Sequence, residues 1–102
     1  MQVNITAKHM DLTGPIEAYI RQKVDRITRH FDRVQQITMV VEKEPRHGFH
    51  VELILDIEGH DDFIANSRHE DLYAAIDLVV DRGVRQLTDH KEKVRNHHHP
   101  EA

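Results

Sequence analysis

Two stretches of the chain carry an excess of positively charged side chains, although the chain as a whole is acidic, with 14 Lys and Arg against 18 Asp and Glu. Residues 21–33 contain five basic and two acidic side chains, and residues 82–95 contain the same numbers. Guanidinium and ammonium groups bind phosphate oxygens, and one arginine can bind two of them at once. Residues 42–62 instead contain seven acidic and two basic side chains. This separation of charge predicts that one face of a small domain binds a polyanion such as RNA.

The histidines are a second set of residues that could take part in chemistry, and the chain has ten of them. Residues 97–99 form a histidine tract at the end of the chain, but the chain has no cysteine, and we expect no dedicated metal site. Histidines gain charge near pH 6, so His30, His69 and His90 would strengthen attraction to RNA in acid. Ordinary surface histidines are the simpler interpretation.

No motif in the sequence is typical of an enzyme. The chain has neither a Gly-rich phosphate loop nor a nucleophile motif. Residues 60–62 (HDD) and 69–71 (HED) could each supply an acid or a base. A turn and a helix start explain these two segments equally well, so we expect a binding protein with no catalytic activity, cofactor or small-molecule substrate.

Length and composition indicate one small domain. A chain of 102 residues with 38% hydrophobic residues can close a single core. The absence of cysteine fits a reducing compartment. The start of the chain lacks the charged and long apolar segments of a signal peptide, and no apolar run approaches the length that crosses a membrane. We therefore expect a soluble cytoplasmic protein.

The first third of the sequence predicts a strand followed by a helix. The first residues alternate between polar and apolar types, as in a half-buried strand. Thr13 can cap a helix, and Pro15 fits its first turn. Five apolar side chains follow at spacings that place them on one helix face, with Arg26, Arg29 and Arg33 roughly opposite. These apolar residues are Ile16, Ile20, Val24, Ile27 and Phe31.

Three further strands are predicted in the middle of the chain. Residues 37–41 (ITMVV) are β-branched and apolar, as strands often are, and residues 45–48 (PRHG) form a turn. Residues 49–58 alternate strictly between apolar and mostly polar side chains, which indicates a strand with one buried face. A turn at residues 58–61 leads to a short strand at residues 63–66.

A second, longer helix is predicted from about residue 69 to about residue 95. Residues 67–70 (SRHE) have the form of a capping box, with Glu70 three residues after Ser67. Gly83 lies within the apolar stripe, where glycine costs about 1 kcal/mol relative to alanine, so we expect the helix to approach the sheet or the first helix closely there. The stripe consists of Leu72, Ile76, Val79, Val80, Leu87 and Val94, and the basic residues on the opposite face are Arg82, Arg85 and Lys93.

The element order β-α-β-β-β-α predicts an α+β fold in which two helices pack on one face of a four-stranded sheet, as in double-stranded-RNA-binding (dsRBD-like) domains. The other face, judged from the third strand, carries His50, Glu52 and Asp56 and lacks the stacked aromatic residues of a sheet that binds single-stranded RNA. We therefore expect the helices to bind RNA. Residues 1–96 are predicted to form one domain, and residues 97–102 a disordered tail.

Four segments of the sequence resemble the bacterial ribosome hibernation factors, which comprise the short hibernation promoting factors and the ribosome-associated inhibitor protein Y. Residues 1–6 (MQVNIT) resemble the family's start, and residues 31–33 (FDR) match the end of its first helix. The most specific block is residues 69–77 (HEDLYAAID), followed by residues 85–87 (RQL). The resemblance extends over nearly the whole chain.

This resemblance implies a function. Proteins of this family bind the 16S rRNA of the small ribosomal subunit near the decoding region, in the channel that messenger and transfer RNA use, and silence the ribosome in stationary phase or stress. The short form favours pairing of 70S ribosomes into 100S particles, helped by a ribosome modulation factor, whereas protein Y inactivates single ribosomes. The lack of an acidic extension favours the short form, but residues 43–45 (KEP) and 69–71 (HED) look more like protein Y. Both alternatives stay open.

The resemblance also implies which residues contact rRNA, because the family uses basic residues on both helices. Asp89 departs from the family pattern, which usually has lysine there. Its carboxylate would either repel phosphate or hold Arg85 or Lys93 in place through i,i+4 pairing. The predicted rRNA-binding residues are Lys23, Arg26, Arg29, Arg82, Arg85, Lys91, Lys93 and Arg95.

Overall fold

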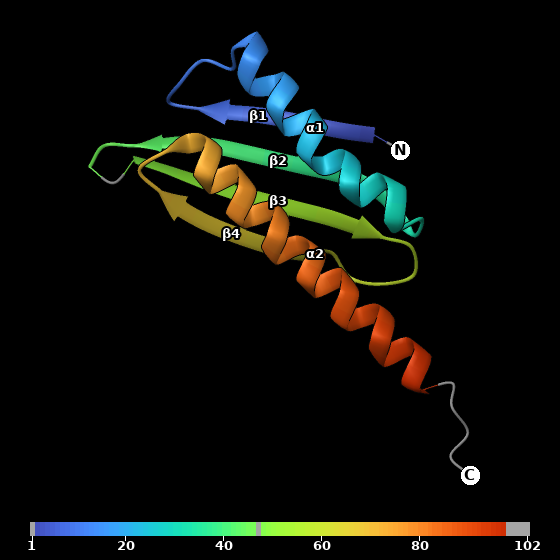
Figure 1. Ribbon diagram of the computed structural model, residues 1–102. Coiled ribbons are helices and arrows are strands. Elements are labelled where there is room, and N and C mark those ends of the chain that lie inside the picture. The colour runs from blue at the N-terminus through green and yellow to red at the C-terminus, as the bar shows by residue number, and fades with distance from the viewer. Residues whose placement is uncertain (1, 47, 98–102) are drawn as a thin grey trace.

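The computed structural model describes residues 2–46 and 48–97, with the backbone alone for residues 94–97. It confirms the α+β class and the predicted order of elements (Figure 1). The elements are β1 (Gln2–Lys8), α1 (Gly14–His30), β2 (Val34–Glu44), β3 (Gly48–Ile57), β4 (Phe63–His69) and α2 (Leu72–His97). Residues 98–102 of the predicted tail lie outside the described residues, and α2 extends two residues past its predicted end.

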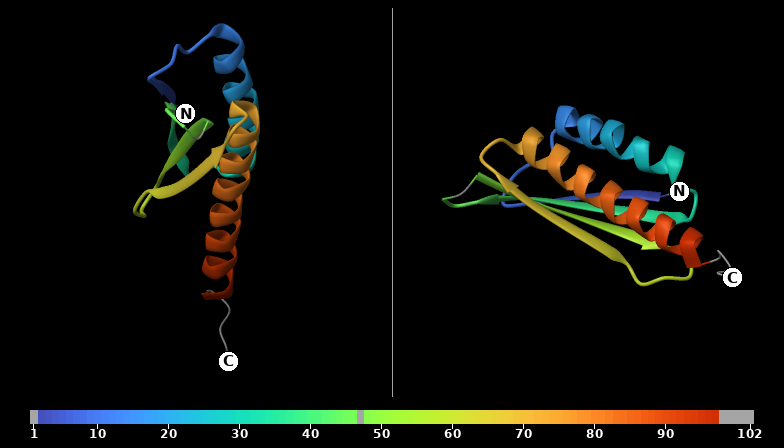
Figure 2. Two further views of the ribbon diagram at one scale, coloured as in Figure 1. Left: turned by 90° about the vertical axis from the view of Figure 1, so that its left-hand side faces the viewer. Right: turned by 60° about the horizontal axis from the view of Figure 1, so that its bottom comes forward.

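One mixed sheet with strand order β1-β2-β3-β4 forms the base of the fold. β1 pairs with β2 in parallel, and the other two pairings are antiparallel. A parallel pair needs a crossover connection, which α1 provides. Both helices therefore cover one face of the sheet, and the other face is open (Figure 2).

The helix α1 begins and ends as its sequence predicts. The hydroxyl oxygen of Thr13 accepts a hydrogen bond from the amide of Ile16 at 3.4 Å, and a proline occupies the first turn. The apolar stripe buries Ile20, Val24 and Ile27 against the sheet. At the C-terminal end, the amide of Phe31 donates to the carbonyl oxygen of Ile27 at 3.0 Å. Phe31 itself is half-buried against the core.

The strands β2 and β3 supply the centre of the core because alternate side chains face the helices. Met39 and Leu53 occupy partner positions in the ladder, and both are fully buried. The turn from β2 leads into β3 at Gly48, whose backbone has a φ of +76°, a conformation that favours glycine. A Cβ atom there would lie 2.6 Å from the carbonyl oxygen of His69, so any side chain would collide with the chain that leads into α2.

The predicted capping box at the start of α2 is wrong. Ser67 lies within β4, where it pairs with Val51 and is buried, and its hydroxyl donates to the carbonyl oxygen of Ala75 at 2.6 Å. The cap is Asp71 instead, because its carboxylate accepts from the amide of Tyr73 at 3.0 Å. Pairing with β3 extends β4 through His69, so the helix begins three residues later than predicted.

Gly83 marks the place where α2 lies closest to the sheet. A Cβ atom at this position would lie 2.7 Å from Cδ2 of Leu53 and 3.4 Å from Cδ1 of Leu55, both of which are buried. The expected close approach is therefore to the sheet rather than to the first helix. No described helix is long and apolar enough to span a membrane.

We predict that Gly83→Ala lowers the free energy of unfolding by about 1 kcal/mol. The gain of about 1 kcal/mol in helix propensity is smaller than the 1–3 kcal/mol cost of overpacking against Leu53. Urea denaturation would measure the change. In a Leu53→Val background, which removes the colliding methyl group, the same substitution should become neutral or stabilising. Equal destabilisation in both backgrounds would contradict this account.

Candidate nucleic-acid interface

The two helices form the layer of the molecule that carries a net positive charge. Together α1 and α2 contain nine Lys and Arg against six Asp and Glu, whereas the rest of the chain contains five against twelve. Both helices run in the same direction across the sheet (Figure 1). Tyr19 of α1 and Tyr73 of α2 pack edge to face between them, with ring centroids 4.8 Å apart.

Two of the predicted basic residues are bound by carboxylates of the opposite helix. Lys23 Nζ lies 3.4 Å from Asp77 Oδ1, and a guanidinium nitrogen of Arg26 lies 3.1 Å from Asp81 Oδ1. All four side chains line the outer groove between the helices. Exposed ion pairs of this kind contribute at most about 1 kcal/mol, so a phosphate group can compete for either cation.

Tyr19 also contacts Asp77, the carboxylate that pairs with Lys23. The hydroxyl of Tyr19 donates a hydrogen bond of 2.7 Å to the Asp77 carboxylate. This hydrogen bond raises the pKa of Tyr19 above its ordinary value, with smaller contributions from burial and from the negative charge of Asp77. The hydrogen bond and charge of Asp77 also raise the pKa of Lys23, which therefore stays protonated.

Arg29 and Arg82 make contacts of their own. Arg29 pairs with Asp25 at 2.6 Å, one turn earlier on α1. Arg82 donates to the backbone carbonyl oxygen of Asn66 on β4. Gln86, one turn later on α2, donates to the carbonyl oxygen of Ile64 at 3.1 Å. Arg82 is exposed, but its guanidinium also has a structural partner at the outer edge of the sheet.

Most of the predicted rRNA-binding residues that lack a carboxylate partner among the described residues lie in the second half of α2. Among the described side chains, Arg85, Lys91 and Lys93 are exposed and form no ion pair. The last turns of α2 project past the end of α1 and the sheet (Figure 1). Arg95 belongs to these turns, but its side chain is not described. A group of exposed cations that form no ion pair with the described residues therefore occupies one end of the helix layer.

Asp89 lies close to this group without pairing with it. It lines a shallow hollow with His90 and Lys93, yet within the described part of the chain its carboxylate has no ion pair. The i,i+4 pairing with Arg85 or Lys93, one of the two roles considered for Asp89, is therefore not formed in this structure. A free carboxylate beside these two cations lowers the local positive potential.

The open face of the sheet is unsuited to phosphate. Glu42 and Glu52 lie on it, and Glu44 pairs with Arg68 at 3.2 Å. His50 contacts the side-chain oxygen of Asn66 at 2.8 Å, which occupies its ring nitrogen. Both phenylalanines of the sheet, Phe49 and Phe63, pack on the helix side, so the open face has no phenylalanine, tyrosine or tryptophan side chain for base stacking.

The sequence interpretation missed the acidic partners of the two helices. Asp77 and Asp81 are four residues apart on α2, so a helical count places them on one face, the face that meets α1. Which helix they would meet depends on tertiary packing. Across the residues described, no group of three or more His, Asp or Glu side chains is arranged to hold a metal ion.

We predict that Asp77→Asn lowers the pKa of Tyr19 toward its ordinary value. A raised pKa stabilises the fold only while the group keeps its proton, so this contribution is lost as the pH rises above about 10. Ultraviolet titration of the phenol would measure it in a Tyr73→Phe background, which leaves Tyr19 as the single tyrosine. Asp81→Asn is the matched control, because Asp81 contacts Arg26 instead. An unchanged pKa in the Asp77 variant would contradict the assignment.

The chain is similar to bacterial proteins named ribosome hibernation promoting factor. The ribosome hibernation promoting factor of Azotobacter vinelandii is 44% identical over 95 residues, which cover 91% of this chain and 85% of that protein. The ribosome hibernation promoting factor of Escherichia coli K12 is 32% identical over 97 residues, which cover 95% of this chain and 100% of that protein.

Solved structures share the fold. A ribosomal subunit interface protein from Coxiella burnetii superposes with a TM-score of 0.82 at 20% identity, covering 90% of this chain and 99% of that one. The N-terminal domain of Thermus thermophilus Protein Y superposes with a TM-score of 0.75 at 26% identity, covering 85% and 96%. The family model described as Sigma 54 modulation protein / S30EA ribosomal protein matches residues 3–95, and the chain belongs to that family.

Proposed function

We propose that this protein binds the small ribosomal subunit through its helix layer and silences translation by occupying the channel of messenger and transfer RNA. The observation that carries the proposal is the exposed group Arg85, Lys91 and Lys93 on the only face where the described charges are net positive. Relatives named ribosome hibernation promoting factor support the choice of ribosome over other polyanions. The site of action is then the cytoplasm, where ribosomes are.

Binding proceeds by contact between cations and the phosphates of 16S rRNA near the decoding region. No described carboxylate holds Arg85, Lys91 or Lys93, so these three contact phosphate first. Lys23 and Arg26 then exchange Asp77 and Asp81 for phosphate, which is feasible because the exposed pairs are weak. The mechanism is occlusion and needs no chemical step, so no residue acts as a catalyst.

The weakest member of the predicted contact set is Arg82, because it would have to leave the Asn66 carbonyl oxygen. We therefore assign it a secondary role at the margin of the interface. Arg29 would exchange Asp25 for phosphate in the same way as Lys23 and Arg26. Arg95 stays in the proposed set on the strength of its position in the last turns of α2.

We predict that the double substitution Arg85→Glu with Lys93→Glu weakens ribosome association at least about 100-fold, because two charge-assisted contacts of about 1.5 kcal/mol or more are lost. Co-sedimentation over a range of salt concentrations would measure it. The variant should also show a shallower salt dependence, since fewer counterions are released. Neither Arg85 nor Lys93 forms an ion pair or a side-chain hydrogen bond with any residue the structure describes, so helix content should stay unchanged.

The matched control for this double variant is Lys43→Glu with Arg46→Glu. It makes the same change in net charge at the hairpin between β2 and β3, at the opposite end of the molecule (Figure 1). Its ribosome association should match that of the unmodified protein. If both double variants lose binding equally, net charge rather than the helix layer determines association.

A second candidate behaviour concerns what the bound ribosomes do next. We propose the short-form activity, in which the protein promotes pairing of 70S ribosomes into 100S particles together with a ribosome modulation factor. The names of the relatives that cover most of this chain favour it. Likeness to the Protein Y domain keeps the alternative, inactivation of single ribosomes, as the competing outcome.

We predict a 100S peak when ribosomes, this protein and the modulation factor are separated on a sucrose gradient. Ribosomes with the modulation factor alone are the control. Inactive 70S particles without a 100S peak would instead support the protein Y behaviour. No change in profile or in translation would contradict the proposed function altogether.

A further inference from the structure

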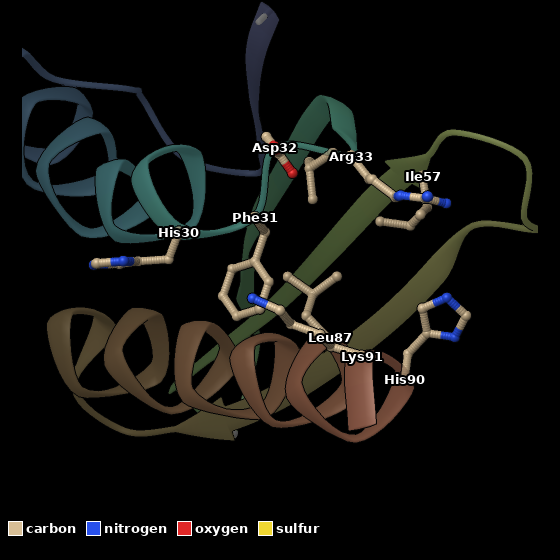
Figure 3. A pocket seen from close by; sticks show the side chains of 9 residues that line it. His30, Phe31, Asp32, Arg33, Ile57, Leu87, His90 and Lys91 are labelled. Carbon is tan, nitrogen blue, oxygen red and sulfur yellow. The ribbon is translucent and has the colours of Figure 1, made fainter. Parts of the chain in front are cut away.

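A small apolar hollow lies between the C-terminal end of α1 and the neighbouring turns of α2. Its volume is about 100 Å³, and its walls are the side chains of Phe31, Val34, Ile57 and Leu87 (Figure 3). Three of these residues belong to the buried core, whereas Phe31 is half-buried and exposes part of its ring. The hollow therefore offers a flat aromatic surface on an otherwise aliphatic floor.

Positively charged side chains stand around this hollow. Lys91 extends its amine to 6.0 Å from the centroid of the Phe31 ring, at the outer limit of a cation–π contact. Arg33 lies on the other side, beside Ile57 (Figure 3). Within the described residues neither cation has an ion pair, and Asp32 is the single acidic side chain of the rim.

We infer that this hollow receives one unstacked nucleobase of the bound RNA, with the base against Phe31 and its neighbouring phosphates held by Lys91 and Arg33. The inference rests on the proposed function and names a specific contact within it. Single-stranded RNA is commonly bound in this way, by aromatic side chains that stack on bases beside cations that contact the backbone.

The combination of apolar wall and cationic rim selects this ligand over the alternatives. A phosphate ion alone would gain nothing from the aliphatic floor, and an apolar protein side chain would gain nothing from Lys91 and Arg33. The volume is well below the 300–1,000 Å³ of sites that enclose a whole drug-sized ligand. It fits a single planar group, so the ribose and phosphate stay outside, at the level of the rim cations.

The position of the hollow agrees with the rest of the interface. The hollow lies at the end of the helix layer where the cations of α2 without an ion pair gather. Leu87 and Lys91, which are one helical turn apart on α2, both line it. The Lys91 amine is weakly held at 6.0 Å, so it can move from the Phe31 ring to a phosphate as the base enters.

The test is Phe31→Leu, which keeps an apolar side chain in the core but removes the aromatic face. Its affinity for ribosomes should fall about tenfold, as expected for loss of one base stack. Phe49→Leu is the matched control, because Phe49 is also half-buried and has the Lys43 amine 4.8 Å from its ring centroid. Phe49 lies at the hairpin between β2 and β3, where its cross-strand partner is Lys43, far from the cationic end of the helix layer, so the affinity of this variant should not change.

A second measurement uses no ribosome. Nuclear magnetic resonance of the intact protein, titrated with a single-stranded RNA hexamer of mixed sequence, should shift the signals of the Phe31 ring and the Leu87 and Val34 methyl groups. Phe31→Leu should reduce the methyl shifts while its spectrum stays that of a folded protein.

The outcomes separate the two proposals. If Phe31→Leu binds ribosomes like the unmodified protein, the nucleobase site is overturned and the proposed function is untouched. If Phe31→Leu loses affinity but the hexamer shifts no signal of the hollow, another group occupies it and the inference is again overturned. If the unmodified protein does not bind ribosomes, the proposed function is wrong. The hexamer titration alone then tests whether the hollow binds a nucleobase.

Discussion

Burial of a single face of the sheet under two helices constrains every other property of this protein. The parallel pairing of β1 with β2 requires a crossover, and α1 provides it on the same side that α2 covers. The apolar stripes of both helices are used in this contact, so their charged residues can only face outward. The opposite face of the sheet keeps its acidic side chains. The separation of charge between the two faces is therefore a consequence of packing.

The same constraint explains why most of the fold could be predicted from the sequence. Alternation in β3 and the stripe of α1 are local patterns, and they specify which side chains are buried before any tertiary contact is known. The start of α2 could not be predicted in this way. Ser67 and Glu70 fit a capping box locally, but pairing with β3 retained Ser67 in a strand and left the cap to Asp71. Long-range pairing outweighed a local signal.

The candidate site shows a similar division. The sequence identified the basic residues of both helices, but charge alone did not reveal which of them are engaged. Lys23 and Arg26 are held by α2, whereas Arg85 and Lys93 face solvent, a difference that depends on how the helices lie side by side. Carboxylates close to a basic surface also sharpen its selectivity. A ligand must present several phosphates in the right geometry to displace them, so weakly charged partners gain little.

The contacts that Arg82 and Gln86 make with β4 have a consequence of a different kind. β4 is the outermost strand on its side of the sheet, and such strands offer unsatisfied carbonyl groups to the strands of other molecules. By donating to the Asn66 and Ile64 carbonyl oxygens, α2 blocks two of these positions with its own side chains. Arg82, which the sequence predicted to bind phosphate, therefore also opposes edge-to-edge aggregation between copies of the protein.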